Sequence, residues 1–325
     1  MSGMELGWGL DLILWIQSWR TPLVETLGLM LAALGSENFY VLVVPVIYWC
    51  IDASLGRRLS LFVLLSLWIN SALKVTLKRP RPYMVSADVK VPVGAVDIGY
   101  GLPSGHAQTA VALWGAVAVE VKRNWVTIAV AVYVVLISVS RLLIGVHYVQ
   151  DVAAGLLIGG VLLILYAWLE KSFGNWFQAQ PLALQIGLVI MVAAAMLAIH
   201  PGLIPISMPP NMPYPLSLDD LLSPSVTPAA VVLGAGIGFI LEYRYLHFNA
   251  SGKAWKRLLR LSLGIVGVLI LRLGLGSLFA NLEPVWVFRL IRYALIGFWI
   301  GYLAPWLFVQ LNLARSLHPE PGNAQ

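Results

Sequence analysis

Charged residues are scarce in this sequence: they make up 11% of its 325 residues, whereas hydrophobic residues make up 59%. A water-soluble domain needs charged and polar side chains to cover its exterior, and this chain has too few of them. The mean hydropathy of +0.83 points the same way. The composition therefore argues against a soluble globular protein and favours a membrane protein.

Cysteine and clustered acidic residues are also lacking. The single cysteine, Cys50, excludes an internal disulfide framework and any metal site made of cysteines alone. Asp88 and Asp97 are scattered in a loop, whereas Mg²⁺ and Ca²⁺ sites need several oxygen ligands together. We therefore expect no metal and no cofactor. The net charge of +6 does not indicate a nucleic-acid partner, because the basic residues fall between apolar segments.

Apolar segments long enough to cross a bilayer recur along the chain. Residues 1–36 contain shorter, weakly amphipathic pieces, which we predict to be interfacial or re-entrant helices. The proline-rich loop 201–226 follows the sixth span and is predicted to be either a lid or a passive connector. We expect an all-α, polytopic membrane bundle with about nine spans, at 37–53, 57–77, 105–121, 125–142, 149–170, 182–200, 226–243, 258–281 and 284–312.

Lys and Arg are absent from the loop 201–226, which places that loop opposite the cytoplasm by the positive-inside rule. The cytoplasmic side is expected to carry Arg57, Arg58, Lys122, Arg123, Lys171, Arg244, Lys253, Lys256, Arg257, Arg260 and Arg315. Six basic residues break this rule and fall on the opposite side: Lys74, Lys78, Arg79, Arg81, Lys90 and Arg141. We attribute that exception to chemistry at three blocks of sequence.

The first block is KVTLKRPRP, in which Lys74 and Arg81 are seven positions apart. Seven positions are about two helical turns, so we predict that both cations lie on one helix face. Pro80 and Pro82 should end the helix there. Arg offers phosphate oxygens a planar fork and Lys a compact charge. By itself, the block is more typical of a basic cap on a spanning helix.

The second block is GLPSGH, which ends at His106. Gly105 permits close backbone approach, and Ser104 is a favoured N-cap for the helix that should follow. The free N–H groups of a helix N-terminus suit phosphate oxygens, and histidine titrates near neutrality. Alone, the block is equally typical of a helix cap with an incidental histidine.

The third block is SRLLIGVHYVQD, in which His147 and Asp151 are four positions apart. That spacing predicts that they meet on one helical face, where the carboxylate would hold one ring nitrogen and leave the other to attack. Arg141 should close the preceding helix. A surface ion pair would explain the residues equally, but charge between strongly apolar segments is costly and typical of function.

Together the blocks resemble the motifs K-x6-RP, PSGH and SR-x5-H-x3-D of the type-2 phosphatidic acid phosphatase superfamily. All three are complete, in order and correctly spaced between residues 74 and 151. The resemblance implies that His147 is the nucleophile, Asp151 orients it, and His106 protonates the leaving oxygen and then activates water. It also implies a set of phosphate-binding residues: Lys74, Arg81, Ser104, Gly105 and Arg141.

The C-terminal half adds four predicted spans, a layout similar to the nine-helix sphingosine-1-phosphate phosphatase and glucose-6-phosphatase relatives. Arg272, Arg289 and Arg292 fall within these spans. We expect them to pair between helices or to snorkel, with Glu283 and Glu242 as possible partners and a lipid headgroup as the alternative. The predicted organisation is interfacial helices at 1–36, a catalytic core at 37–171, a four-helix extension at 182–312 and a polar tail at 313–325.

The sequence thus predicts a metal-independent phosphatase that hydrolyses a lipid phosphate or diphosphate through a phosphohistidine. Undecaprenyl diphosphate, phosphatidic acid, phosphatidylglycerol phosphate and phosphorylated sphingoid bases all remain open as substrates. Transfer of the phosphoryl group to a lipid or sugar acceptor, and hydrolysis of a sugar phosphate, are the near alternatives. An anionic-lipid transporter is the alternative of another class. We expect a bacterial inner membrane, with the site on the extracytoplasmic face, and the sequence leaves the oligomeric state open.

Overall fold

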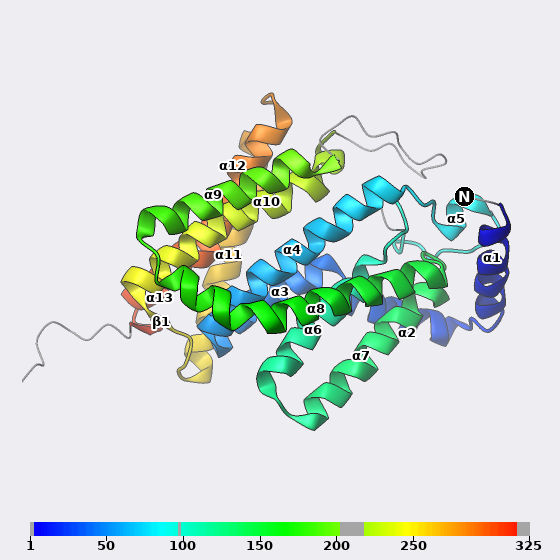
Figure 1. The fold of residues 1–325 in the computed structure, drawn as a ribbon, viewed down its shortest axis with the longest axis horizontal. Helices are drawn as coiled ribbons and strands as arrows, with labels where there is room; N and C mark the ends of the chain where they lie inside the picture. Colours follow the sequence, from blue (N-terminus) through cyan, green and yellow to red (C-terminus); the bar gives the residue numbers. More distant parts are fainter. Residues whose placement is uncertain (1–2, 97–98, 202–217, 317–325) are drawn as a thin grey trace, which may run out of the picture. The chain divides into compact units, whose positions relative to one another are not determined.

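The fold was analysed in a computed structural model that describes residues 3–96, 99–201 and 218–316. Almost all the regular structure in these ranges is helical, as Figure 1 shows. The chain divides into two compact units. The first contains residues 1–40 and 65–174, and the second contains residues 41–64, 175–203 and 217–325.

The first unit is built from six helices and the part of a seventh that leads into them. The two N-terminal helices are α1 (Gly3–Ser18) and α2 (Pro22–Leu34). Thr21 caps α2, and Pro22 occupies its first turn, where the missing N–H costs nothing. The C-terminal part of α4 (Ala53–Leu77) follows. The remaining helices are α5 (Pro82–Val85), α6 (Gly105–Val121), α7 (Asn124–Leu143) and α8 (Val149–Gln178).

Glycines on α8 bring its first turns against α6. A Cβ atom at Gly155 would lie 2.5 Å from the backbone oxygen of Ser104, and one at Gly159 would lie 2.7 Å from that of Gln108. Small residues of this kind let two helix backbones approach closely within a membrane. This packing brings the start of α8 beside the GLPSGH block.

The second unit combines regular helices with three π-helical turns. Its helices are most of α3 (Glu37–Val46), the N-terminal part of α4, α9 (Leu182–Ile199), α10 (Leu218–Leu241), α11 (Ala254–Leu278), α12 (Val285–Phe298) and α13 (Ala304–Gln310). The π-helical turns are η1 (Ile47–Ile51), η3 (Glu242–Leu246) and η4 (Trp299–Leu303). Two short strands, β1 (Phe248–Asn249) and β2 (Arg315–Ser316), pair in antiparallel fashion.

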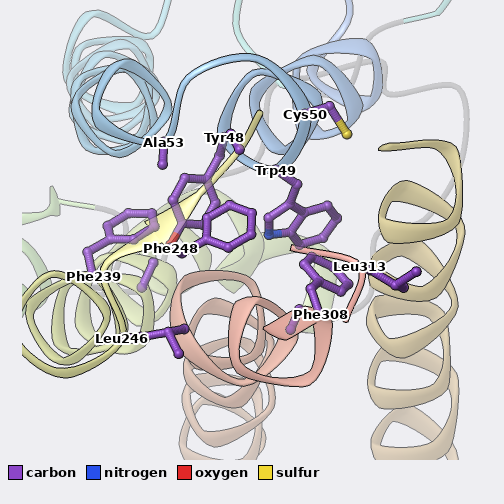
Figure 2. Packing of buried hydrophobic residues seen from close by; sticks show 12 residues of the cluster. Tyr48, Trp49, Cys50, Ala53, Phe239, Leu246, Phe248, Phe308 and Leu313 are labelled. Atoms are coloured by element: carbon purple, nitrogen blue, oxygen red, sulfur yellow. The ribbon is translucent and has the colours of Figure 1, made fainter. Parts of the chain in front are cut away.

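An aromatic cluster forms the core of the second unit (Figure 2). The hydroxyl of Tyr48 donates to the backbone oxygen of Gly301 over 2.9 Å, and the indole of Trp49 donates to that of Ile300 over 3.1 Å. Both acceptors lie in η4, where a π-helical turn alters the regular hydrogen-bond ladder. The ring of Phe308 meets Trp49 edge-on, with centroids 5.7 Å apart. Aromatic N–H and O–H groups therefore reach backbone oxygens that the widened turn presents.

The spanning segments agree with the predicted all-α membrane bundle. In the described ranges, seven helices are long and apolar enough to cross a bilayer, and the pair Pro22–Leu34 and Phe39–Ile51, bent by 50°, is an eighth candidate. Helix α6 coincides with the predicted span at 105–121, and its 17 residues measure about 26 Å along the axis. With α6, the candidates number nine.

Two boundaries differ most from the predictions. Helix α8 runs on to Gln178, through most of the stretch from Lys171 to Pro181 that looked like a polar linker. Helix α10 begins at Leu218 and carries Pro224 and Pro228 within it, whereas the span was expected to begin at 226. Prolines are tolerated there because neighbouring groups in a membrane bundle can satisfy the freed backbone carbonyls. Residues 202–217 of the predicted lid or connector lie outside the described ranges.

Candidate active site

The first block ends a spanning helix, but not in the predicted way. Helix α4 ends at Leu77, and Lys78 follows with a positive φ of 49°. Arg81 lies beyond the helix, as the N-cap of α5, so Lys74 and Arg81 do not share a helix face. Pro80 and Pro82 flank Arg81 where α4 cannot continue, and Arg81 is fully buried.

The second block forms a turn that opens α6. Ser104 occupies the N-cap position, as predicted, but its hydroxyl makes no capping hydrogen bond. That hydroxyl is buried and has no hydrogen-bond partner among the described residues. A Cβ atom at Gly105 would lie 3.8 Å from Lys74 Nζ. The start of α6 thus presents a hydroxyl and a helix N-terminus close to an ammonium group, which suits an anion.

A buried amide network holds this turn against α4. The side chain of Asn70 donates to the backbone oxygen of Pro103 over 3.3 Å and to Gln108 Oε1 over 2.8 Å. Gln108 in turn donates to the backbone oxygen and the hydroxyl of Ser66. These side chains are buried, so each hydrogen bond replaces one that water would otherwise make. The network fixes the GLPSGH turn relative to Lys74.

In the third block, a hydrogen bond at the start of a helix brings Asp151 close to His147. His147 lies in the turn before α8, which begins at Val149, so His147 and Asp151 do not share a helical face. Instead, Asp151 reaches back and accepts a hydrogen bond from the backbone N–H of Tyr148 over 2.9 Å. A carboxylate in the first turn that binds the N-cap N–H forms half of a capping box. This cap holds the carboxylate near His147.

The His147 imidazole lies between a carboxylate and a guanidinium. Its Nδ1 is 3.5 Å from Asp151 Oδ2, and its Nε2 is 3.2 Å from Arg81 Nη1. Arg81 is fixed by donating to the backbone oxygens of Gly99 and Val146, over 2.8 and 3.0 Å. With its proton on Nδ1, facing the carboxylate, His147 carries its lone pair on Nε2. That lone pair faces the cation.

Arg79 also contacts Asp151, although it lies outside the residues that the sequence motifs predict for the site. Its Nη1 is 3.6 Å from Asp151 Oδ1, and both side chains are buried. Its guanidinium lies 4.9 Å from the centre of the Tyr148 ring. Burial raises the pKa of Tyr148 to about 12, so the phenol stays neutral. The sequence contains one indication of this role: Arg79 is a second arginine two positions before Arg81, and it is one of the basic residues that break the positive-inside rule.

The two remaining predicted site residues, His106 and Arg141, lie at the start of α6 and at the end of α7. His106 is the second residue of α6, and its ring faces the N-terminal helices, because a Cβ atom at Gly35 would lie 3.0 Å from His106 Cδ2. Arg141 is buried in the last turn of α7, and its backbone oxygen accepts from Val146 N over 3.3 Å. Arg141 thereby braces the turn that carries His147.

All the predicted site residues belong to the first unit, at or beside the end of α4, the start of α6, the end of α7 and the start of α8, with Arg81 at the start of α5. Adjacent antiparallel spans begin and end alternately, so these four ends lie at one side of a membrane. Within the described residues, no three His, Cys, Asp or Glu side chains come together in a way that could hold a metal ion.

Known proteins share this organisation. Residues 56–174 match the PAP2 superfamily, and residues 226–316 match the transmembrane extension of PAP2 superfamily phosphatases. Human sphingosine-1-phosphate phosphatase 2 is 29% identical over 223 residues, which cover 67% of this chain and 51% of that protein. The chain therefore spans about half the length of this relative.

A dihydrosphingosine 1-phosphate phosphatase of Schizosaccharomyces pombe is 24% identical over 333 residues, covering 95% of this chain and 74% of that protein. The crystal structure of a PAP2-type phosphatidylglycerolphosphate phosphatase from Bacillus subtilis aligns with a TM-score of 0.46 and 21% identity, over 53% of this chain and 88% of that one. The two matched regions together take in the site and most of the second unit, and this multi-pass membrane protein belongs to the PAP2 superfamily.

Proposed function

We propose that this protein is a membrane phosphatase that hydrolyses a lipid phosphate or diphosphate through a phosphohistidine at His147, without a metal ion. The observation that carries the proposal is the placement of His147, with Nδ1 3.5 Å from Asp151 and Nε2 3.2 Å from Arg81. One ring nitrogen faces a carboxylate that would hold its proton during the reaction, and the other faces a cation that would attract phosphate oxygens.

Phosphate binding is assigned to the cations and donors of the three sequence blocks. Three cations, Lys74, Arg81 and Arg141, would neutralise the phosphate oxygens, which is the task that Mg²⁺ performs in many phosphoryl-transfer enzymes. The hydroxyl of Ser104 and the backbone N–H of Gly105 would add donors at the start of α6. A set of fixed donors in a buried site stabilises the charge that spreads over the transferring group.

The reaction then proceeds in two balanced steps. In the first, His147 Nε2 forms a bond to phosphorus while the bond to the lipid oxygen breaks, and His106 gives its proton to that oxygen. In the second, His106 takes a proton from water, whose oxygen bonds to phosphorus as the bond to Nε2 breaks. Inorganic phosphate leaves, and both histidines return to their starting states. Asp151 stabilises the positive charge on His147 between the steps.

Phosphorylated sphingoid bases are the substrates to test first. The matched relatives are named as phosphatases of sphingosine 1-phosphate and dihydrosphingosine 1-phosphate, which are lipid phosphate monoesters. The site itself contacts only the phosphate, so phosphatidic acid and undecaprenyl diphosphate belong in the same panel. The bacterial inner membrane stays a prediction from the sequence.

The test is phosphate release by the purified full-length protein in detergent with EDTA, compared with His147→Asn. A matched control is His247→Asn, because His247 lies in the second unit, at a positive φ of 49° that asparagine also adopts. We expect release that survives EDTA, is unchanged in His247→Asn and falls at least a thousandfold in His147→Asn. Loss of release in EDTA that returns with Mg²⁺ would overturn the metal-free mechanism.

The same preparation separates the alternative functions. If the folded wild-type protein releases no phosphate from any substrate but transfers it to an added lipid or sugar alcohol, the protein is a phosphotransferase. If it does neither, and reconstituted vesicles still move an anionic lipid after His147→Asn, the transporter alternative holds. The phosphohistidine can be tested by labelling the protein with radioactive phosphate. We expect the label to be lost from the protein in acid, because a phosphohistidine hydrolyses there. Label that the protein retains in base, and that requires His147, would support the intermediate.

We also propose that the site faces the extracytoplasmic side, since Lys122 and Arg123 join the opposite ends of α6 and α7. A membrane-impermeant thiol reagent on intact cells tests this, with cysteine introduced at the exposed positions Asp88→Cys, near the site, and Arg123→Cys, at the far end. The native Cys50 is buried and gives a low background. Labelling of the second variant alone would reverse the orientation.

A further inference from the structure

Asp151 is held from two directions. Its Oδ2 accepts from Tyr148 N and faces His147, whereas its Oδ1 lies 3.6 Å from Arg79 Nη1. The Asp151 side chain has no exposed surface, and that of Arg79 is 5% exposed. A carboxylate removed from water needs a compensating cation, and the loss of that partner is costly. Arg79 therefore supplies the charge for the carboxylate oxygen that His147 does not use.

Arg81 is engaged elsewhere. Its guanidinium donates to two backbone oxygens and faces His147 Nε2, on the side where the phosphate is proposed to bind. The two arginines of the same turn thus face the two ends of the His147–Asp151 pair. Arg81 lies at the nucleophilic nitrogen, and Arg79 lies at the far oxygen of the carboxylate.

The Arg79 guanidinium is itself fixed in place. It lies 4.9 Å from the centre of the Tyr148 ring, a cation–π distance, and the backbone N–H of Tyr148 binds Asp151. The backbone oxygen of Arg79 accepts from Gly101 N over 2.8 Å, which ties the turn to the second block. A Cβ atom at Gly101 would lie 3.0 Å from Asp151 Oδ2, so this glycine leaves room for the carboxylate.

We infer that Arg79 is a positioning residue, which holds the Asp151 carboxylate so that Oδ2 stays directed at His147 Nδ1. This inference rests on the proposed function, because it concerns the rate at which His147 attacks. Among the described residues Arg79 contacts Asp151, Tyr148 and Gly101 and none of the groups assigned to the phosphate, so its removal should slow the chemistry and leave phosphate binding intact. A phosphate-binding arginine would show the opposite pattern, with weaker binding of substrate and product.

The test compares kcat, KM and the inhibition constant of inorganic phosphate in the full-length protein. We expect Arg79→Gln to lower kcat about 10- to 100-fold, because the buried carboxylate loses the cation beside its Oδ1, with KM and the inhibition constant changed less than threefold. Arg79→Lys should restore part of the rate, because it retains the charge. Lys78→Gln is the control: it removes one positive charge from an exposed neighbouring position and should leave kcat unchanged.

A double-mutant cycle shows whether Arg79 acts through Asp151. In an Asp151→Asn background the carboxylate charge is gone, so Arg79→Gln should cost less than threefold there. An equal loss in both backgrounds would overturn the inference, as would a rise in the phosphate inhibition constant that matches the fall in kcat/KM. An inactive wild type would instead contradict the proposed function. Thermal unfolding within a few degrees of wild type excludes misfolding, and if Arg79→Gln unfolds, Arg79→Lys carries the same cycle.

Discussion

Asn70 and Gln108 join α4 to α6 through a 2.8 Å hydrogen bond between their buried side-chain amides. Asn70 also holds the backbone oxygen of Pro103, the residue before Ser104, and a Cβ atom at Gly105 would lie 3.1 Å from Asn70 Oδ1. The shape of the proposed phosphate-binding turn therefore depends on an amide one helical turn before Lys74. Polar side chains within a membrane bundle can link helices in this way.

We expect Asn70→Leu to reduce both stability and activity. The change leaves Gln108 and the backbone oxygen of Pro103 without their shared donor, which should cost about 1–3 kcal/mol in the free energy of unfolding. Thermal unfolding in detergent and phosphate release measure the two effects. Thr76→Val is the control, because its exposed hydroxyl binds only the backbone oxygen of Ala72 within the same helix. Equal behaviour of the two variants would contradict the importance of the network.

Glycine 155 offers a sharp test of the α6–α8 contact. Gly155→Ala would place a methyl group 2.5 Å from the backbone oxygen of Ser104, so the helices must separate. We expect a lower kcat, because the shift moves Asp151 relative to Ser104, whose N–H donates to the Asp151 backbone oxygen over 2.9 Å. Gly160→Ala, in the same helix with nothing within 4 Å, should keep full activity and unfold at the same or a higher temperature.

The N-terminal helices should matter for catalysis through Gly35. A methyl group there would lie 2.8 Å from Ile137 Cγ2 and 3.0 Å from His106 Cδ2. We expect Gly35→Ala to lower kcat by displacing the proposed acid, with less effect on inhibition by inorganic phosphate. Gly7→Ala is the matched control, since no atom lies within 4 Å of that position. If both variants keep wild-type kcat, α2 does not support His106.

The second unit should be required for stability rather than for phosphate chemistry. Glu242 is buried there and accepts from Arg57 Nη1 and from Phe248 N, over 2.5 and 2.7 Å. Removal of one partner of a buried ion pair costs about 3–5 kcal/mol. We expect Glu242→Gln to lower the unfolding temperature while KM of the remaining folded protein is unchanged. The control is Glu283→Gln, at an exposed position. A changed KM in Glu242→Gln would contradict the prediction that the second unit contributes stability and not phosphate chemistry.

The charged residues of the C-terminal spans have partners that differ from those suggested by the sequence. Glu242 and Glu283 were considered as partners for the arginines of the last two spans, but Glu242 pairs with Arg57. Arg289 instead donates to Thr227 Oγ1 over 2.9 Å and to Ser223 Oγ over 2.6 Å. The expected pairing between helices is present, but with hydroxyl groups on α10. Sequence spacing does not determine such partners, because they come from helices that are distant in the chain.

The sequence by itself determined the membrane class, the three motifs and the limits of α6, α7 and α9 to within one residue. These features are local: apolar length, proline, glycine and motif spacing act on their own segments. The domain boundaries and the roles of the site residues stay predictions.

Only the tertiary structure decided how the site residues meet. Lys74 lies in the last turn of α4 whereas Arg81 caps α5, and His147 precedes the helix whose cap holds Asp151. Arg79 reaches the carboxylate from another turn, 72 positions away in the sequence. Helical periodicity predicts contacts within one helix, whereas these contacts arise where helices end. The direction of the chain there depends on which buried charges and amides can satisfy one another.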